Sequence, residues 1–193
     1  MISINKKPGI HMVANNLIRI LILSFLFLST IQCGSSAAGE TKIATTQDSY
    51  QCIPCGSDCD KETYSKPRKC PHCQMQLVKR STVNFKTIQP ADLCNYIQTH
   101  PDVVLLDVRT KEEFEGKKKP VFGTLKNAIN VPIQELEERL AELAPYKEKE
   151  VIVYCSHSHR SPRASYILTQ NGFTNITNMA GGMSELKDRS CVK

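Results

Sequence analysis

The sequence of 193 residues predicts an α/β domain, a parallel sheet flanked by helices, preceded by a small cysteine-rich knuckle domain. Two observations predict this organisation. From about residue 85 onward, short apolar runs of strand type alternate with helical stretches, as in a parallel sheet with helices on both faces. Before that, five of the nine cysteines crowd into residues 52–73, where the chain is too short for an apolar core. The length accommodates one ordinary domain and a smaller one.

The charge of the chain argues against a nucleic-acid ligand. The sequence contains 25 lysines and arginines against 19 aspartates and glutamates, a formal net charge of +6. Much of the positive charge lies near the N-terminus and in "GKKKP", and no element concentrates basic residues with aromatic residues between them. Nucleic-acid binders usually show such a concentration. We therefore expect no nucleic-acid partner.

Residues 1–33 have the pattern of an export signal. "MISINKKPGIHMVANNLIR" is basic and free of acidic residues, and the apolar run "ILILSFLFL" is well short of the roughly 20 residues of a transmembrane helix. The next stretch, "STIQCGSS", resembles a bacterial lipoprotein signal in which Cys33 becomes the lipidated first residue, with Gln32 where Gly, Ala or Ser is usual. An ordinary secretory peptide or an uncleaved anchor is the alternative. The resemblance implies an extracytoplasmic protein of the bacterial cell envelope, held to the membrane by the lipid on Cys33.

Residues 34–49, "GSSAAGETKIATTQDS", predict a flexible tether. The stretch is small and polar and has no apolar period, so it cannot bury enough surface to order itself. A lipid-anchored protein needs such a segment between its domains and the bilayer.

Residues 50–80 predict a metal-binding domain. They contain two Cys-x-x-Cys pairs and one further thiol: Cys52 and Cys55, Cys70 and Cys73, and Cys59. Two such knuckles aimed at one centre make a tetrahedral sulfur site that suits zinc, and Cys59 could serve as a substitute ligand. In an oxidising compartment the same five cysteines could instead form two disulfides with one thiol left over.

The same stretch resembles the small heavy-metal-binding domain found beside copper and other metal efflux proteins. Its second half, "KPRKCPHCQMQL", keeps the pattern of that family. The first half departs from it, because "CIPCG" has Cys55 where the family has His and lacks the family's Met. The resemblance implies a bound metal ion, and the extra thiol makes zinc or another soft ion fit as well as copper.

Residues 85–193 carry the alternation of strands and helices. The apolar runs predict strands at 85–89, 102–108, 127–131, 150–155 and 174–179. The intervening stretches predict helices at 90–100, 110–116, 132–143 and 161–172, the first with proline in its first turn. In such sheets, ligands bind at the carboxyl ends of the strands. Cys155 stands at one of these ends, in "VIVYCSHSHRSPRAS".

Four stretches in order, "VVLLDVRTKEEFEG", "GTLKNAINVP", "VIVYCSHSHRSPRAS" and "ITNMAGGM", resemble the signatures of the rhodanese (sulfurtransferase) domain. The resemblance runs from residue 85 nearly to the end and implies a rhodanese-like fold. The sequence departs from the family in an insertion, "KKKPVF", and at three residues: Thr124 for His, Ser158 for Gly and Leu186 for Trp.

The active loop predicted from these residues runs from Cys155 to Arg160. A thiolate at a helix N-terminus is stabilised by the backbone N–H groups and the helix dipole, which makes Cys155 a candidate nucleophile. Arg160 adds a fixed cation for an anionic donor, and the loop residues between them would line the site: Ser156, His157, Ser158 and His159. The loop has six residues, whereas the related cell-cycle phosphatases have seven, which favours sulfur over phosphate.

The resemblance implies an enzyme that moves sulfane sulfur from a small anion such as thiosulfate through a Cys155 persulfide to a thiol or cyanide, without a cofactor for the transfer. It also implies that Asp107 and Arg109 order the active loop rather than react. The alternative is a metal-handling protein in which Cys155 and the two loop histidines form a second soft-metal site. Cys94 is expected to be a buried thiol and Cys191 a loose thiol of the tail, although Cys191 could also resolve a persulfide on Cys155.

Overall fold

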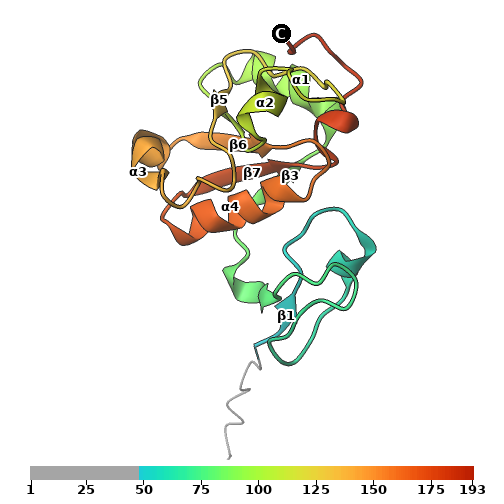
Figure 1. Ribbon diagram of the computed structural model, residues 1–193. Coiled ribbons are helices and arrows are strands. Elements are labelled where there is room, and N and C mark those ends of the chain that lie inside the picture. The colour runs from blue at the N-terminus through green and yellow to red at the C-terminus, as the bar shows by residue number, and fades with distance from the viewer. Residues whose placement is uncertain (1–47) are drawn as a thin grey trace, which may run out of the picture. The chain divides into compact units, whose positions relative to one another are not determined.

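A computed structural model describes residues 48–193 (Figure 1). The predicted export signal, with Cys33, and the tether up to residue 47 lie outside the described residues. Within residues 48–193, no helix has the length and apolar character needed to cross a membrane.

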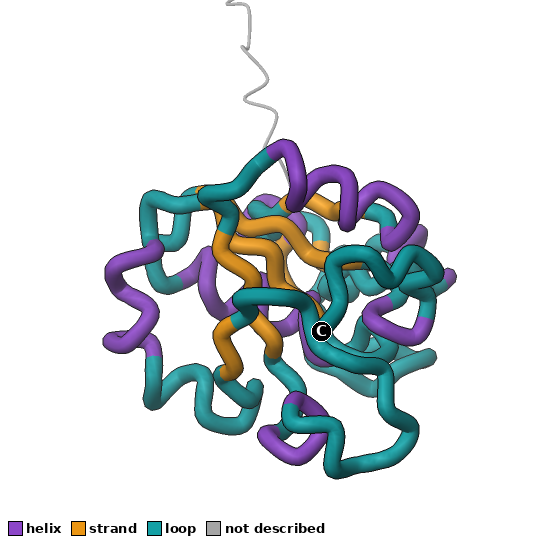
Figure 2. The backbone as a smooth tube through the Cα atoms, turned by 90° about the horizontal axis from the view of Figure 1, so that it is seen from above, coloured by secondary structure: helices purple, strands orange, loops and turns teal. Residues whose placement is uncertain are grey.

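A five-stranded parallel sheet forms the main domain, and the predicted α/β class is confirmed. The strand order is β3-β7-β6-β4-β5. Parallel pairing joins each neighbouring pair of strands, with Val104–Asp107 of β4 beside Val151–Tyr154 of β6. Figure 2 shows the strands at the centre with helices and loops around them. The strands are β3 (Lys86–Ile88), β4 (Val104–Asp107), β5 (Ile129–Asn130), β6 (Glu150–Tyr154) and β7 (Asn175–Met179).

Helices cover both faces of the sheet because successive strand residues point to opposite sides. Val151 and Val153 of β6 pack in one core cluster with Leu168 of α4, whereas Ile152 packs in the other cluster with Leu93 of α1. Figure 1 shows α1 and α4 on opposite sides of the sheet. The helices are α1 (Pro90–Thr99), α2 (Lys111–Phe114), α3 (Leu140–Leu143) and α4 (Arg160–Gln170), with short 3-10 helices η3 (Ala144–Tyr146) and η4 (Gly182–Ser184).

The helix predicted at residues 132–143 is wrong over most of its length. Residues 133–139 form consecutive turns, and only α3 at the end is helical. Bonds such as Leu136 N to Ile133 O and Glu142 N to Arg139 O close these turns. A chain of three-residue turns places apolar residues at nearly the same spacing as an α-helix. The hydrophobic period therefore identified the buried face but not the backbone conformation.

The cysteine-rich segment has a small two-stranded sheet of its own. Strands β1 (Tyr50–Gln51) and β2 (Val78–Lys79) pair antiparallel, and two 3-10 helices, η1 (Asp58–Lys61) and η2 (Arg80–Thr82), accompany them. The buried members of its core are almost all sulfur-bearing: Cys52, Cys59, Cys70 and Leu77. A core of this kind has little apolar area to bury, so its stability depends on what holds the sulfurs together.

Cys94 is buried as expected, but neither Cys94 nor Cys191 is the free thiol that the sequence predicted, because the two residues form a disulfide. Cys94 lies on α1 and Cys191 in the C-terminal tail, 97 residues apart in sequence. The tail is not loose: Lys126 N donates to Cys191 O at 2.9 Å, and Lys193 N donates to Thr124 O at 2.8 Å. The C-terminal tail thus runs beside residues 124–126, and this path places Cys191 next to α1.

Candidate active site and cysteine cluster

The loop 155–160 connects the end of β6 to the first residue of α4, as the sequence predicted. Cys155 is 1% exposed. The side chains that follow it alternate, so that the two serines are buried and the two histidines exposed (Ser156 and Ser158, His157 and His159). The sulfur of Cys155 lies 3.5 Å from Ser161 Oγ in the first turn of α4. The thiol therefore lies at the N-terminus of an eleven-residue helix.

Ser158 adopts a conformation that glycine adopts more easily. Its φ is +62°, in the left-handed region, which a residue with a Cβ rarely adopts. Its hydroxyl is buried and has no hydrogen-bond partner among the described residues. The loop of this protein thus contains both backbone strain and an unpaired polar group at one residue.

A glycine turn after β7 holds the active loop from the other side. Met183 N donates to Cys155 O at 2.9 Å, and Ser184 N donates to Ser156 O at 3.0 Å. A Cβ on Gly182 would lie 2.5 Å from Ser156 O and 2.7 Å from Cys155 O. Only glycine allows this approach, which gives the "GGMS" stretch a physical role in shaping the site.

Glu113 belongs to the candidate site, although it is not among the site residues that the sequence predicted. Its carboxylate accepts two hydrogen bonds from Arg160, at 2.6 and 2.8 Å, and one from Ser156 Oγ at 2.9 Å. These contacts, Arg160 first among them, hold the pKa of Glu113 far below its usual range. Glu113 also completes a capping box with Thr110 at the start of α2. The Thr-x-x-Glu spacing was a visible signal for the cap, but not for the contact with the loop.

Asp107 and Arg109 form a buried ion pair beneath this corner of the site. Arg109 donates to Asp107 with Nη2 at 2.6 Å and with Nε at 3.0 Å, and both side chains are almost fully buried. Arg109 Nη2 also donates to Gly123 O, and Thr124 Oγ1 donates to Phe114 O at 2.7 Å. The pair thus ties β4 to the segment that follows the insertion.

The histidines of the loop do not form a metal site with Cys155. His157 and His159 are exposed, and the ring of His157 makes an edge contact with Phe122 at 5.3 Å between centroids. Within residues 48–193, the side chains grouped closely enough to hold a metal ion include neither these histidines nor Cys155. The geometry therefore does not favour the metal-handling alternative at this loop.

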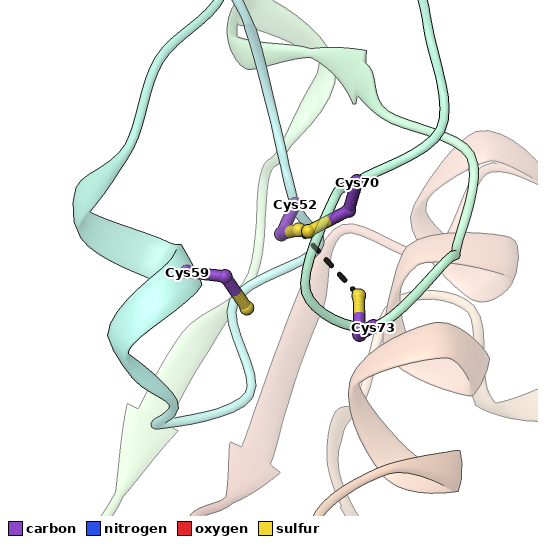
Figure 3. Close-up of side chains that lie close together, drawn as sticks. All are labelled: Cys52, Cys59, Cys70 and Cys73. Carbon is purple, nitrogen blue, oxygen red and sulfur yellow. Dashed lines mark hydrogen bonds between the residues drawn. The ribbon is translucent and has the colours of Figure 1, made fainter.

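Four thiols converge in the cysteine-rich segment: they include the predicted pair Cys70 and Cys73 and the possible substitute Cys59, but not Cys55 (Figure 3). The four sulfurs, of Cys52, Cys59, Cys70 and Cys73, all lie within 4.8 Å of one another. Cys52 Sγ and Cys73 Sγ are 3.7 Å apart, close to the edge of about 3.8 Å of a tetrahedron with zinc–sulfur bonds of about 2.3 Å. Cys59 thus takes the place expected for Cys55.

Cys55 is directed into its own loop. Its backbone N donates to Asp60 Oδ2 at 2.8 Å, and its sulfur contacts Ser57 Oγ at 3.3 Å. It groups with Asp60 and Cys59 but not with the other three thiols. The helical turn η1 places Cys59 inward, which a reading of Cys-x-x-Cys spacing could not show. All five cysteines of this domain are free thiols in the structure rather than disulfides.

The environment of the four converging thiols resists ionisation of all of them together. Burial raises the pKa of Cys59 to about 11. Burial acts in the same direction on Cys70, but the backbone of Cys73 and the thiol of Cys52 outweigh it and lower its pKa to about 7. Several thiolates at these distances repel one another, so a cation at their centre is needed to ionise all of them. The residues fit a soft metal ion.

The comparisons with known proteins concern the second domain. The Rhodanese-like domain family matches residues 90–189. Thiosulfate sulfurtransferase PspE of Escherichia coli is 35% identical over 81 residues, 42% of this chain and 71% of that protein. The tRNA uridine(34) hydroxylase of Hamiltonella defensa is 30% identical over 122 residues, 57% of this chain but only 33% of that protein. A rhodanese-related protein from Thermoplasma volcanium is similar in structure, with 33% identity and a TM-score of 0.45, over 55% of this chain and 94% of that one.

Proposed function

Because the chain belongs to the rhodanese-like domain family, we propose that it is an extracytoplasmic sulfurtransferase that carries sulfane sulfur as a persulfide on Cys155. The observation that carries the proposal is the construction of the loop. Cys155 lies between β6 and the N-terminus of α4, and its carbonyl is held by Met183 N. A similar relative is named a thiosulfate sulfurtransferase, which supports thiosulfate as one donor.

The reaction needs only the thiolate and the loop. The Cys155 thiolate attacks the sulfane sulfur of thiosulfate, the sulfur–sulfur bond of the donor breaks, and sulfite leaves with the bonding electron pair. The new persulfide then gives its outer sulfur to cyanide, forming thiocyanate, or to a thiol, forming another persulfide. Each acceptor attack returns Cys155 to the thiolate. The backbone N–H groups of the loop and the N-terminus of α4 stabilise the anionic forms.

Two independent features support the proposed location. The pattern of residues 1–33 predicts export with a lipid on Cys33, and the disulfide between Cys94 and Cys191 is of the kind that persists in oxidising compartments. We propose that the lipid holds the protein to the membrane on the extracytoplasmic side of a bacterial cell.

The test of sulfur transfer is mass spectrometry of the chain after treatment with thiosulfate. Wild-type protein is expected to gain one sulfur atom on Cys155 and to lose it on addition of cyanide. The Cys155→Ser variant should gain none, because an alkoxide is not available at neutral pH. Cys55→Ser, which alters a thiol of the other domain, is the control and should gain sulfur like the wild type. A wild-type protein that gains no sulfur from any sulfane donor would overturn the proposal.

The four converging sulfurs favour a second function, the binding of a metal ion. We propose that Cys52, Cys59, Cys70 and Cys73 hold one zinc or similar soft ion, which supplies the cohesion that apolar burial cannot supply in this small domain. Free thiols so close together in an oxidising compartment would otherwise tend to pair as disulfides.

The choice between Cys59 and Cys55 makes a sharp test of this site. Native mass spectrometry should find about one zinc per chain in the wild type and in Cys55→Ser. Cys59→Ser should lose most of the metal, because one of four thiolate ligands is gone. If Cys55→Ser loses the metal and Cys59→Ser keeps it, the ligand set is the pair of knuckles after all. If thiol counting in denaturant finds these cysteines oxidised, they form disulfides and do not bind a metal ion.

A further inference from the structure

Both arginines beside the active loop are already paired with carboxylates. Arg109 is held by Asp107, and the two side chains are 1% and 0% exposed. Arg160 is held by Glu113 through both terminal nitrogens, with side chains 27% and 15% exposed. Arg160 is thus not a free cation waiting for an anion.

The pairing of Arg160 with Glu113 lowers the net positive charge of the groups around the Cys155 sulfur. Glu113, and more weakly Cys155, raise the pKa of Arg160, which indicates that the sulfur lies within the electrostatic reach of the guanidinium. Arg160 Nη2 also donates to Ser156 Oγ at 3.2 Å, so its donors are directed at Glu113 and the loop. The negative charges of the two carboxylates cancel the positive charges of the two guanidinium groups. The N-terminus of α4 supplies only a fraction of a positive charge.

We propose that Glu113 sets the donor preference of this site: by holding Arg160 in a neutral ion pair, it favours a singly charged organic persulfide over dianionic thiosulfate. The inference rests on the proposed sulfurtransferase function and assigns its substrate class. A thiosulfate dianion approaching the Cys155 thiolate meets a stronger repulsion than a monoanion does, and an unpaired cation beside the sulfur would offset more of it than a paired one. A persulfide brings half of that charge, and the backbone N–H groups of the loop suffice to stabilise it.

The corresponding transfer is balanced without a further reagent. The Cys155 thiolate attacks the outer sulfur of a persulfide, RSS⁻. The sulfur–sulfur bond breaks, the inner sulfur leaves as the thiolate of R, and Cys155 carries the outer sulfur. The leaving thiolate takes up a proton from water.

The test compares two donors on matched variants. The donors are thiosulfate and the persulfide of mercaptoethanol, and the readout is the second-order rate constant for loading Cys155, measured by quenched-flow mass spectrometry. Glu113→Gln removes the charge but keeps the size, and glutamine is an accepted partner in a capping box. Glu112→Gln is the control, because Glu112 is the exposed neighbour on the same short helix. We expect the ratio of thiosulfate to persulfide rate constants to rise about tenfold or more in Glu113→Gln, equal to about 1.4 kcal/mol, and to stay within about twofold in Glu112→Gln.

A double variant guards against a simple loss of structure. Glu113→Gln combined with Arg160→Met removes both charges, so its ratio should return close to that of the wild type. If Arg160 instead binds thiosulfate directly in the wild type, the ratio in the double variant will fall far below it, and the proposal is overturned. An unchanged ratio in Glu113→Gln, with both rate constants lowered equally, would leave Glu113 with a structural role only. Failure of both donors to load the wild type would overturn the sulfurtransferase function itself.

Discussion

Ser158 shows at the scale of a single residue how this loop departs from its family. The residue has a φ of +62° and a buried hydroxyl without a partner in the described part of the chain. Left-handed backbone costs a non-glycine residue about 1 kcal/mol or more, and an unpaired buried hydroxyl costs about 1–3 kcal/mol. Both penalties fall within the loop that carries the candidate nucleophile, which makes local strain part of the candidate site.

Replacing Ser158 should therefore stabilise the protein. Ser158→Gly is expected to raise the free energy of unfolding by about 1 kcal/mol, since relief of strain and loss of the unpaired hydroxyl exceed the extra entropy that glycine loses. Ser158→Ala removes the hydroxyl but keeps the strain, and should fall between serine and glycine. Ser81→Gly, at an exposed residue outside the left-handed region, should lower stability slightly. Denaturation with urea measures the free energy of unfolding of all three variants. A Ser158→Gly variant that is no more stable than the wild type would contradict the claim that Ser158 is strained.

At the scale of elements, the active loop is supported by two segments far from it in sequence. The turn after β7 donates two backbone hydrogen bonds to the first carbonyls of the loop. Glu113 of α2 accepts hydrogen bonds from the side chains of Ser156 and Arg160, at the two ends of the loop. The loop is thus positioned by hydrogen bonds from both sides, in addition to the strand and helix that it connects.

The close approach of Gly182 can be tested with a matched glycine. Gly182→Ala should lower the rate of Cys155 loading about tenfold or more, because the new Cβ must displace the backbone of the loop. Gly172→Ala has a similar positive φ of +84°, but its nearest neighbour would be the end of the Lys147 side chain at 3.7 Å. It should lower stability by about 1 kcal/mol and leave loading nearly unchanged. Equal effects on loading by the two variants would show that the contact with the loop is unimportant.

At the scale of the whole molecule, the disulfide between Cys94 and Cys191 closes most of the main domain into one loop. It joins α1 to a tail that runs beside residues 124–126, the segment held by Arg109. A cross-link that closes a loop of this length removes many conformations from the unfolded chain. Stability of the domain is therefore linked to the redox state of its compartment.

Removal of the disulfide should lower the free energy of unfolding by about 2–4 kcal/mol. The paired substitution of Cys94→Ala with Cys191→Ala avoids leaving one reactive thiol, and thermal or chemical denaturation measures the loss. Addition of a dithiol reductant should bring the wild type close to the variant and should not destabilise the variant further in this domain. If thiol counting in denaturant finds Cys94 and Cys191 reduced in protein isolated from its compartment, the cross-link is absent there.

The sequence alone determined the class of fold, the order of its elements and the place of the candidate nucleophile. Strand and helix periods are local properties, so apolar runs and amphipathic stretches identify elements before any packing is known. Cys155 could be found because its strand end and its helix start are adjacent in the chain. The region of the sulfur cluster was likewise visible from the crowding of cysteines.

The tertiary structure decided which side chains meet. Glu113 and Arg160 are 47 residues apart, and Cys94 and Cys191 are 97 apart. The exchange of Cys55 for Cys59 depended on a short helical turn that orients one thiol inward. Periodicity reports which face of an element is buried, but partners across the fold depend on how elements pack and where loops return. For that reason the candidate nucleophile could be chosen from the sequence, whereas the carboxylate that pairs with Arg160 emerged only from the folded chain.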